Sequence, residues 1–447
     1  MSFHPERVTE LSVFMNSDRV GTLYNADPLE FAYDDAWLAH PAATPLHLLI
    51  PLQPGKVSSP HIHAFFENLL PEGEQRKIVN LRYHVTTVFG LLATVGGDTA
   101  GSVVLLPAGQ VPEPPAYERI TWDQVNAILH DAGALAASHP GDDSEDEIDP
   151  GVRVTISGAQ RKILLSLNAE GEPLRPLGTT PSTYILKPDI ERTDAKVFAS
   201  AFNETIVMRA ARICQLPTAE VAYQPLVRAC MITRYDRVMS DDETLRRLWQ
   251  ADFCQVAGVP STVKYEFDGG PSFKDCYELL KKSSVAPAND LLNLLRWLFF
   301  NLYVGNNDSH AKNLALLAMP EGLRLAPFYD LMCTSVYSGL GKNFAFKIGE
   351  EFHSGKIERK HIEALAVSLG VAPKFMFSMA EKMARQVEGA IPEAIRGLRS
   401  DLGQLGHNEQ ILATRIEQTV TSNVKKMRAR IFGGADEQGT VNLPKKI

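Results

Sequence analysis

The stretch VGNNDSHAKNLAL, residues 304–316, gathers an acid, a histidine, a lysine and several amides within a few positions. It follows LLNLLRWLFFNLYVG, residues 291–305, the longest apolar run of the chain. That run carries two asparagines and an arginine and is shorter than the roughly 20 residues that span a bilayer, so it predicts a buried helix. A polar cluster directly after a buried helix indicates a loop that is held rigid for a chemical purpose.

The composition sets the broad class of the protein. A chain of 447 residues is long enough for two or three domains with a substantial core. The formal net charge of −8 argues against nucleic-acid binding by the whole chain. Five scattered cysteines without a C-x-x-C pair argue against a disulfide framework and a zinc site, and favour a reducing, cytoplasmic location. The N-terminal sequence lacks the pattern of a signal peptide, and we expect no membrane contact.

Strand-like runs dominate the first half of the sequence. Four of them, SVFMN, RVGTLY, LEFAY and LHLLIPL, precede the helical pattern of HAFFENLLPEGEQRKIVNLRY. The Pro-rich segment AGQVPEPPAYE, residues 108–118, predicts a domain boundary. Three further strand candidates, VRVTIS, KILLSL and STYILK, precede a long amphipathic helix in DAKVFASAFNETIVMRAARICQL and a hairpin in TAEVAYQPLVRACMITRYDR.

The second half of the sequence has a different pattern. From Arg237 onward it is mostly helical, with RLAPFYD as a short strand. Sheets first and helices afterwards predict an α+β protein with two unlike lobes and a cleft between them.

The spacing of acids and amides in and after the polar loop fits phosphoryl transfer from ATP. Asp308 precedes Asn313 by five positions in DSHAKN, and Asp330 follows in LAPFYD after a short hairpin. One carboxylate can orient or deprotonate an acceptor hydroxyl, while an amide and a second carboxylate hold magnesium on the phosphates. Magnesium prefers oxygen ligands and keeps several waters, so two protein ligands suffice.

A kinase also needs a cation for the α and β phosphates. Lys187 ends the strand candidate STYILK, and Glu204 in the following helix is a candidate partner for it. The alternatives are a solvated charge at a strand edge and an ordinary charge on a helix surface. In the polar loop, His310 fits either a phosphate or nucleotide contact or a hydrogen-bonded lock of the loop. Lys312 fits either a phosphate or acceptor contact or an inert, exposed position.

Two further segments are candidates for nucleotide contacts. TISGAQRK, residues 155–162, lies between two strand candidates and has one glycine, so it matches neither a Walker A loop nor G-x-G-x-x-G, and by spacing alone it is a hairpin turn. Its hydroxyl residues Thr155 and Ser157 are candidate phosphorylation sites. ITRYDR, residues 232–237, occupies the position of an interlobe hinge, where Tyr235 either meets an adenine ring or belongs to the core.

Two other motifs carry less weight. His61 and His63 have no third ligand nearby in the sequence, so a surface role is favoured over a metal site. The basic run NVKKMRARIF near the C-terminus is favoured as a solvated helix face over a nucleic-acid contact.

Together these motifs resemble the HipA family of serine/threonine kinase toxins, over nearly the whole chain. The resemblance rests on FMNSDRVGTL, LIPLQPG and FFENLLPE in the first part, and on ISGAQRK, YILK, RYDR, CQVAGVPSTVKYEFDGGP, GNNDSHAKN and LAPFYDL later. It implies a two-lobed protein-kinase-like fold of the phosphatidylinositol-kinase-like branch. The implied divisions are a HipA N-terminal subdomain at residues 1–112, a nucleotide-binding lobe with the phosphate loop at residues 113–236, and a helical C-terminal lobe with the catalytic and metal-binding loops at residues 237–447.

The resemblance also implies roles for particular residues. Asp308 is similar to the catalytic aspartate, and Asn313 and Asp330 are similar to the magnesium ligands. The implied nucleotide-binding set is Lys187, Thr155, Ile156, Ser157, Gly158, Ala159, Gln160, Thr233, Tyr235, His310 and Lys312. In the family, autophosphorylation of a serine ejects the phosphate loop; here Thr155 takes that position, with Ser157 two residues on. Thr233 stands where the family commonly has an acid, so adenine contacts are expected from backbone groups and Tyr235.

Family membership would imply ATP and Mg²⁺ as cofactors and a HipB-type helix-turn-helix antitoxin as a partner, with DNA bound only through that complex. The implied activity is phosphorylation of a serine or threonine on a translation factor such as an aminoacyl-tRNA synthetase. Three rivals remain open. A purely structural scaffold would not need the four residues Lys187, Asp308, Asn313 and Asp330, and is the least favoured. A pseudokinase acting only in a repressor complex would lack one of the four residues that carry the chemistry, all of which are present. A small-molecule kinase would share the same site chemistry.

Overall fold

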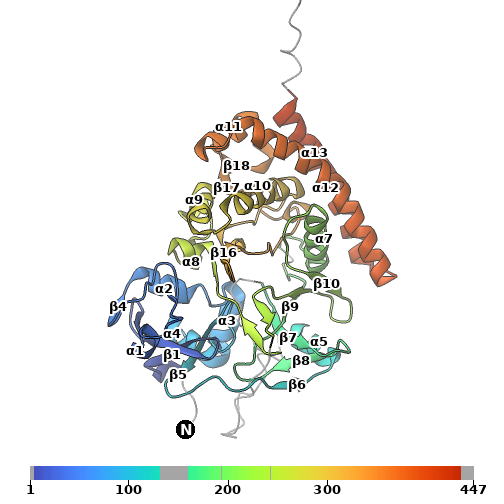
Figure 1. Cartoon of the computed structure of the whole chain (residues 1–447). Helices are drawn as coiled ribbons and strands as arrows, with labels where there is room; N and C mark the ends of the chain where they lie inside the picture. Colours follow the sequence, from blue (N-terminus) through green and yellow to red (C-terminus); the bar gives the residue numbers. More distant parts are fainter. Residues whose placement is uncertain (1–4, 131–159, 193, 242, 434–447) are drawn as a thin grey trace, which may run out of the picture.

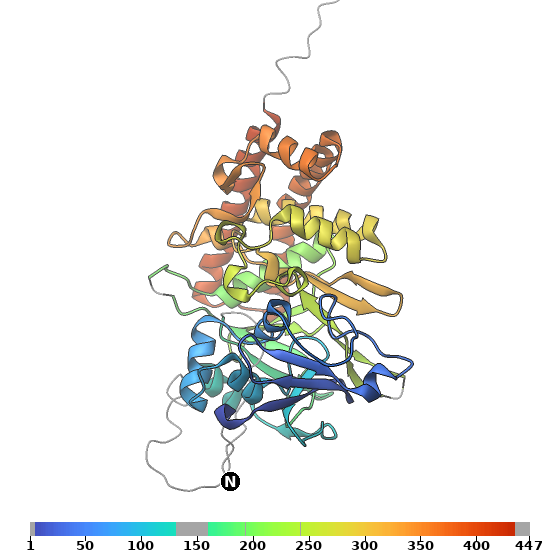
Figure 2. The same cartoon turned by 90° about the vertical axis from the view of Figure 1, so that its left-hand side faces the viewer.

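The computed structural model describes residues 5–130, 160–192, 194–241 and 243–433. Figure 1 shows the sheet-rich first half of the chain below and the helical second half above it. The view in Figure 2, turned by 90°, keeps the same division. The predicted mixture of sheets with a helical C-terminal region is confirmed.

The N-terminal part is built on a five-stranded antiparallel sheet with the order β4-β3-β2-β1-β5. Its elements are η1 (Pro5–Arg7), β1 (Glu10–Met15), β2 (Asp18–Tyr24), β3 (Glu30–Tyr33), α1 (Asp35–Leu38), β4 (Lys56–Ser58), α2 (Pro60–Glu67), α3 (Gly73–Tyr83), α4 (Val88–Val95) and β5 (Val103–Pro107). Gly21 permits close strand pairing, because a Cβ there would lie 2.2 Å from the carbonyl oxygen of Ala32 on β3. Phe65 and Phe66 of α2 join the sheet residues in one buried core.

The second sheet has six strands in the order β10-β11-β9-β7-β8-β6. This region contains β6 (Tyr117–Arg119), α5 (Trp122–His130), β7 (Ile163–Leu167), β8 (Pro173–Pro176), β9 (Tyr184–Pro188), α7 (Ser200–Ile213), β10 (Val221–Gln224) and β11 (Ala229–Thr233). β9 lies between β11 and β7, so Lys187 stands in the middle of the sheet, opposite Cys230 of β11. Helix α7 packs against β9, β10 and β11 and is buried along most of its length.

The described residues of the C-terminal half form six α-helices together with short hairpins. Its strands are β12 (Arg237–Met239), β13 (Leu245–Arg247), β14 (Gln250–Asp252), β15 (Ala315–Met319), β16 (Gly322–Leu325), β17 (Asn343–Ile348) and β18 (Glu351–His353). Its helices are α8 (Phe253–Ala257), α9 (Phe273–Ser283), α10 (Pro287–Val304), α11 (Arg359–Ser368), α12 (Pro373–Leu402) and α13 (His407–Phe432), with 3-10 turns η2 (Ser261–Val263), η3 (Glu266–Asp268), η4 (Ala311–Asn313), η5 (Thr334–Val336) and η6 (Ser354–Lys356).

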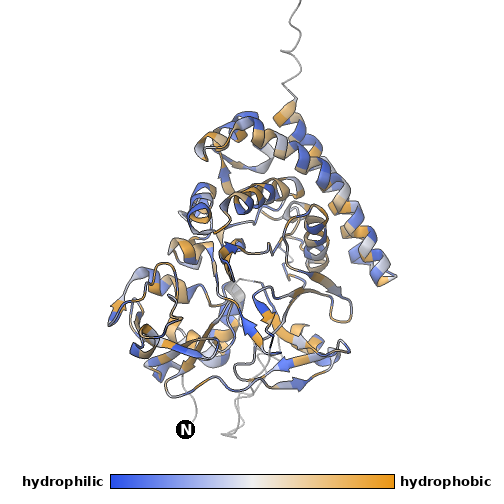
Figure 3. Ribbon diagram, viewed as in Figure 1, coloured by the Kyte–Doolittle hydropathy of each residue, from blue (hydrophilic) through white to orange (hydrophobic). Residues whose placement is uncertain are grey.

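The buried helix predicted from the apolar run is α10. Its residues Trp297, Leu298, Phe299 and Phe300 are fully buried, and α10 packs against α9, α12 and α13. Along α12 and α13, hydrophilic and hydrophobic residues alternate in Figure 3, as expected for helices that place one face on a core and the other in water. The packing of α10 therefore holds the first residue of the polar loop that follows it in place.

The predicted strand LHLLIPL is wrong. Residues 46–52 form a short turn in which the Ile50 N–H donates to the His47 carbonyl at 2.9 Å. The Tyr33 hydroxyl donates to the Ile50 carbonyl at 2.6 Å and accepts from the Leu46 N–H at 2.7 Å. A buried side chain therefore supplies the hydrogen bonds that a neighbouring strand would have supplied.

Two further predicted elements are shorter than expected, and a third lies outside the described residues. The strand expected in RLAPFYD is shorter than predicted, because β16 ends at Leu325 and Phe328 forms only an isolated bridge with Thr218. The helix expected from residue 194 begins later, at Ser200, because Ala199 before it has a left-handed backbone with φ of 46°. The strand candidate VRVTIS lies outside the described residues.

A buried ionic cluster joins the N-terminal part to the rest of the chain. The carboxylate of Asp98 meets Arg237 at 2.9 Å, and Asp236 meets both Arg234 at 2.8 Å and Arg237 at 2.9 Å. The Gly101 N–H also donates to Asp236 at 2.7 Å. Breaking one partner of a buried ion pair leaves an unpaired charge, so this cluster constrains how the N-terminal part sits on the RYDR segment.

All five cysteines are buried and none forms a disulfide bond, as their spacing in the sequence predicts. In the described ranges, no single helix has the length and hydropathy of a membrane span. The helical segments Gln75–Tyr83 and Val88–Val95 have them only as a pair, with a bend of 84° between them.

His47 gives a pH-dependent test of this fold. Its ring lies between Phe65 and Trp249, with centroids at 5.0 and 6.1 Å, and burial lowers its pKa from 6.5 to about 4. The unfolded chain takes up a proton near the ordinary pKa while the folded protein resists it, so stability is lost as pH falls from about 6.5 toward 4. Between pH 7 and pH 5 we expect this histidine to remove about 1–2 kcal/mol from the free energy of unfolding.

Urea denaturation at the two pH values measures this loss. The His47→Gln variant should lose less stability on acidification than the wild type, because its side chain at this position does not titrate. His40→Gln, which changes an exposed histidine of the same domain, is the reference variant. Equal acid losses in the wild type and His47→Gln would contradict the assignment.

Candidate active site

Asp308 lies on the loop that connects α10 to β15. The loop begins at Gly305, whose φ is 75° and where a Cβ would lie 2.2 Å from Ser335 Oγ. The Asn306 side-chain amide donates to Asn301 at 2.8 Å, and the Asn307 N–H donates to Thr334 Oγ1 at 2.8 Å. Asp308 is exposed although its neighbours are buried. The loop therefore presents one carboxylate to solvent from a rigid frame.

Tyr265 contacts this carboxylate directly. The Tyr265 hydroxyl donates a short hydrogen bond to Asp308 Oδ1. Burial raises the pKa of Tyr265, and the Asp308 charge raises it further, so the phenol stays protonated as a donor. The contact holds one oxygen of Asp308 and leaves Oδ2 for another partner.

The two residues expected to bind magnesium each retain an oxygen. Asn313 Nδ2 donates to the Asp308 carbonyl at 3.2 Å, which leaves the amide oxygen of Asn313 to bind elsewhere. Asp330 has a left-handed backbone with φ of 58°, binds Lys187 through Oδ1, and has a side chain that is 40% exposed. Two oxygen donors suit Mg²⁺, which completes its shell with water and phosphate. Within the described residues, no group of three or more His, Cys, Asp or Glu side chains is placed to hold a metal.

Lys187 lies between two carboxylates. Its Nζ is 2.7 Å from Glu204 Oε1 and 2.6 Å from Asp330 Oδ1. Burial alone would lower the pKa of Lys187, but Asp330 and Glu204 raise it above the ordinary range, so the ammonium stays charged. Burial raises the pKa of Glu204, and Lys187 opposes this shift. The hypothesised contact between Lys187 and Glu204 is confirmed, and the solvated-edge alternative for Lys187 is wrong because β9 is a central strand.

The Lys187 ammonium also acts on Asp330. Burial raises the pKa of Asp330, but the attraction of Lys187 outweighs burial and brings the pKa to about 2. Asp308 and Asp330 both influence the pKa of His310 and of Tyr265. The two acids, which lie 22 positions apart in the sequence, are therefore both close enough to act electrostatically on these two side chains.

His310 is buried beside Tyr265. The two rings meet edge to face with centroids at 4.9 Å. Burial lowers the pKa of His310 to about 4, so it is neutral near pH 7. Its Nδ1 atom is buried and accepts or donates no hydrogen bond within the described part of the chain. The ring therefore helps to place Tyr265, and its predicted phosphate contact remains a prediction.

Lys312 is not the exposed loop residue that the sequence allowed. It is buried, and its Nζ donates to Asn68 Oδ1 at 2.6 Å and to Asp252 Oδ2 at 2.8 Å. Glu72 lies at 3.7 Å from the same ammonium. These contacts turn Lys312 toward the N-terminal part, so the geometry favours a structural role over contact with phosphate.

Thr233 and Tyr235 lie at the end of the second sheet. Thr233 closes β11 opposite Tyr184 of β9, and Tyr235 packs against Tyr329 with ring centroids at 5.9 Å. Tyr329 in turn donates from its hydroxyl to the carbonyl of Lys312. Tyr235 thus lies between the second sheet and the polar loop after α10, and its contact with adenine remains a prediction.

Most of the predicted phosphate loop lies outside the described residues. This applies to Thr155, Ile156, Ser157, Gly158 and Ala159. Gln160 is described, and its side chain donates to the Pro188 carbonyl at 3.1 Å, directly after Lys187 on β9. The end of the predicted loop is therefore next to the strand that carries the ammonium group.

Sequence reasoning missed several residues of this site. Lys162 is buried, and burial followed by the nearby Lys187 charge lowers its pKa to about 8. Tyr265, Lys264 and Glu72 also surround the catalytic loop. Lys162 is the last residue of the predicted phosphate loop, and the other three lie in FFENLLPE and CQVAGVPSTVKYEFDGGP, which carry the family resemblance but were given no role. The other three are too far from Asp308 in the sequence for any spacing rule to connect them.

The weaker motifs have ordinary surroundings. His63 Nδ1 accepts from the Leu29 N–H at 3.4 Å, and His61 lies against Gly258. In the basic run, Arg428 pairs with Glu381 of α12 at 2.6 Å, and Arg430 donates to the Ile357 carbonyl at 2.9 Å. These contacts tie α13 to its neighbours.

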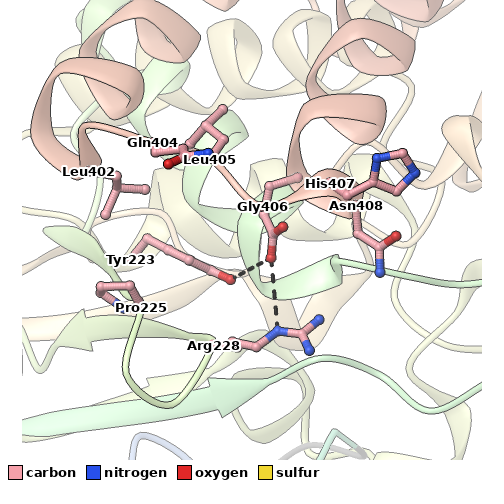
Figure 4. A pocket seen from close by; sticks show the side chains of 10 residues that line it. Tyr223, Pro225, Arg228, Leu402, Gln404, Leu405, Gly406, His407 and Asn408 are labelled. Carbon is pink, nitrogen blue, oxygen red and sulfur yellow. Dashed lines mark hydrogen bonds and ion pairs between the residues drawn. The ribbon is translucent and has the colours of Figure 1, made fainter.

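A hollow of about 410 Å³ lies apart from these residues, between the β10–β11 turn and the junction of α12 with α13. Figure 4 shows Tyr223 and Arg228 pointing toward the same carboxylate, that of Glu409, at 3.0 and 3.9 Å. None of the candidate catalytic or metal-binding residues lines it. Its contacts connect the second sheet to the C-terminal helices.

The Lys187 contacts predict a specific pattern of stability. Lys187→Met should leave Glu204 buried without its cation and cost about 3–5 kcal/mol in the free energy of unfolding. The double variant Lys187→Met/Glu204→Gln should recover at least half of that loss, because no buried charge remains in the pair. Urea denaturation of the wild type and of both variants measures the two values.

Lys274→Met changes an exposed lysine of α9 and is the control variant. A loss below about 1 kcal/mol for Lys187→Met, or a double variant that is no more stable than the single one, would show that the ammonium does not balance a buried charge.

Known proteins resemble this chain along most of its length. A family model described as the HipA N-terminal domain matches residues 11–106, and one described as the HipA-like C-terminal domain matches residues 154–391. Y4mE of Sinorhizobium fredii is 34% identical over 80% of this chain and 86% of its own length. The serine/threonine-protein kinase toxin HipA of Shewanella oneidensis is 29% identical over 83% of this chain and 85% of its own length.

A solved structure supports the same relationship. The complex of HipA, HipB and operator DNA from Shewanella oneidensis contains a chain that matches with a TM-score of 0.79 and 25% identity. The match covers 94% of the present chain and 98% of that chain. The predicted kinase-like, two-lobed fold is confirmed.

Proposed function

The chain belongs to the HipA family of kinases, and from this premise we propose that it transfers the γ-phosphoryl group of ATP to a serine or threonine of a protein. The observation that carries the proposal is the buried Lys187 ammonium, which lies between Glu204 and Asp330. A lysine paired with a helix carboxylate, a metal-binding acid and a catalytic acid are the parts that a protein kinase requires.

Asp308 acts as the base in this proposal. Its Oδ2 takes the proton of the acceptor hydroxyl as the oxygen–phosphorus bond forms and the bond to the β-phosphate oxygen breaks, which releases ADP. Tyr265 holds Oδ1 and fixes the direction in which the free oxygen points. Transfer then depends on position more than on covalent chemistry, as in other phosphoryl transfers.

Asn313 and Asp330 hold magnesium in this proposal. Bound magnesium supplies charge neutralisation on the phosphate oxygens. The low pKa of Asp330, about 2, keeps its carboxylate ionised at neutral pH. Lys187 and Lys162 face the α and β phosphates, and the segment from Thr155 to Gln160 supplies backbone N–H groups. Thr233 and Tyr235 remain candidates for the adenine side, while Lys312 acts only in holding the loop.

Regulation and partners follow from the family. We propose that Thr155 or Ser157 is autophosphorylated, that a HipB-type antitoxin binds this chain and carries the DNA contacts, and that the protein substrate is a translation factor such as an aminoacyl-tRNA synthetase. The family-model boundaries at residues 106 and 154 support the division near residue 112. The second division is proposed near residue 236, just after β11, the last strand of the six-stranded sheet along the chain, ends at Thr233.

Intact-mass spectrometry after incubation with ATP and magnesium tests the activity. The wild type should gain one or more phosphoryl groups, and peptide mapping should place them on Thr155 or Ser157. Asp308→Asn should gain them about 10²–10⁴-fold more slowly, because the general base is lost. Asp330→Ala should also lose transfer, because a metal-binding oxygen is removed. Asp18→Asn, which changes an exposed aspartate of the N-terminal sheet, should behave as the wild type.

The same experiment separates the rivals. Loop phosphate already present in the purified protein would mean a kinase that has silenced itself. A bare loop that gains nothing, together with ATP consumed in the presence of a metabolite, would favour a small-molecule kinase. A bare loop without ATP consumption would favour a pseudokinase of a repressor complex. Unchanged transfer in Asp308→Asn would show that the base is another residue.

A further inference from the structure

The N-terminal sheet domain reaches the catalytic loop through the junction of α2 and α3. Asn68 in this junction accepts from Lys312 Nζ at 2.6 Å and donates to the Val259 carbonyl at 2.9 Å. Glu67 accepts from the Ser261 N–H at 3.0 Å and from its hydroxyl at 2.8 Å. The junction is therefore bonded to the segment before Tyr265 and to the catalytic loop itself.

Glu72 occupies the centre of this contact. It stands at the position that precedes α3, but its side chain makes no cap to that helix. Instead, Oε2 lies 2.8 Å from Lys264 Nζ, and Oε1 lies 3.7 Å from Lys312 Nζ. The carboxylate is 11% exposed. Burial raises its pKa, but Lys312 and Lys264 bring the pKa below its ordinary value, so Glu72 is charged at neutral pH.

Both lysines adjoin residues that act in the proposed transfer. Lys264 precedes Tyr265, whose hydroxyl holds Asp308 Oδ1, and its ammonium also lies 5.7 Å from the centre of the Tyr265 ring. Lys312 precedes Asn313 and belongs to the same 3-10 turn, η4. The Glu72 carboxylate, which comes from the N-terminal domain, therefore holds both Lys264 and Lys312. These lysines directly precede Tyr265 and Asn313.

We propose that Glu72 is a positioning residue of the transfer site, through which the N-terminal sheet domain holds Tyr265 and the catalytic loop in their working arrangement. The inference rests on the proposed function, because it assigns Glu72 to the transfer site around Asp308. Asp252 and Asn68 still hold Lys312 when Glu72 is absent. Loss of Glu72 therefore loosens Lys264 and Tyr265 first and leaves most of the loop's frame in place.

Steady-state kinetics of Glu72→Gln test the role. The amide keeps the shape of the side chain and removes its charge, so Asp308 should lose its fixed direction. We expect kcat to fall about 10- to 100-fold, because a misplacement of about 1 Å at a reacting atom has an effect of this size. The KM for ATP should change less than about threefold, because Lys187 and Asp330 are untouched.

Tyr265→Phe is the second variant, since it removes only the hydroxyl. If Glu72 acts through Tyr265, the double variant should be no slower than the slower single variant, whereas independent effects would multiply. Glu30→Gln changes a carboxylate of the same domain that pairs with Lys56 on the surface, and it should leave kcat unchanged. A kcat for Glu72→Gln within twofold of the wild type would overturn the proposal.

A second measurement does not depend on activity. Hydrogen exchange followed by mass spectrometry should show faster exchange in residues 261–270 of Glu72→Gln, a smaller increase in residues 305–314, and no change in the N-terminal sheet. Unchanged exchange in both segments would overturn the inference even if the wild type proved inactive. An inactive wild type with the expected exchange pattern would instead overturn only the proposed function and leave Glu72 as the residue that orders the loop.

Discussion

The arrangement of the site depends on the placement of a single buried cation. Lys187 stands on the central strand of the second sheet, Glu204 comes from the helix packed on that sheet, and Asp330 comes from the loop after β16. A buried ammonium is costly without close partners, so the two carboxylates stabilise this packing, and the fully buried Glu204 contributes the contact that is the more shielded from water. The same electrostatic requirement that stabilises the fold therefore also brings Asp330, the proposed magnesium ligand, to the strand that we propose binds the nucleotide.

A second constraint joins the N-terminal domain to this arrangement. Asp98 forms ion pairs with two arginines of the RYDR segment. Lys312 of the loop after α10 donates to Asn68 and lies 3.7 Å from Glu72. Both contacts are buried and both place opposite charges across the boundary. Buried charge pairs tolerate little relative movement, because separation leaves each partner unpaired. The N-terminal domain is consequently part of the frame that supports the catalytic loop.

The sequence predicted local features well and long-range contacts poorly. The strands around KILLSL and STYILK, the buried helix α10 and the polar loop after it follow from residue patterns that act over a few positions. The pairing of Lys187 with Glu204 could be predicted because β9 and α7, which carry them, follow each other in the sequence. The turn at residues 46–52 was missed because the Tyr33 hydroxyl makes the hydrogen bonds that a neighbouring strand would otherwise have made. Glu72 and Tyr265 were missed because only the folded chain brings them to the catalytic loop.

The polar cluster after α10 can now be understood from its partners. The Asn306 side chain binds Asn301, the Asn307 side chain donates to the Gly341 carbonyl, Lys312 binds the N-terminal domain, and His310 supports Tyr265. Each of these side chains is buried. Burial of a polar group is tolerated when its hydrogen bonds are supplied by the protein, as they are for the amide group of Asn306 and the ammonium of Lys312; among the described residues, Asn307 Oδ1 and His310 Nδ1 have no such partner. Asp308 is the exception, because it is exposed and is held through only one oxygen. The buried polar residues therefore stabilise the loop, and the single exposed acid is left available for chemistry.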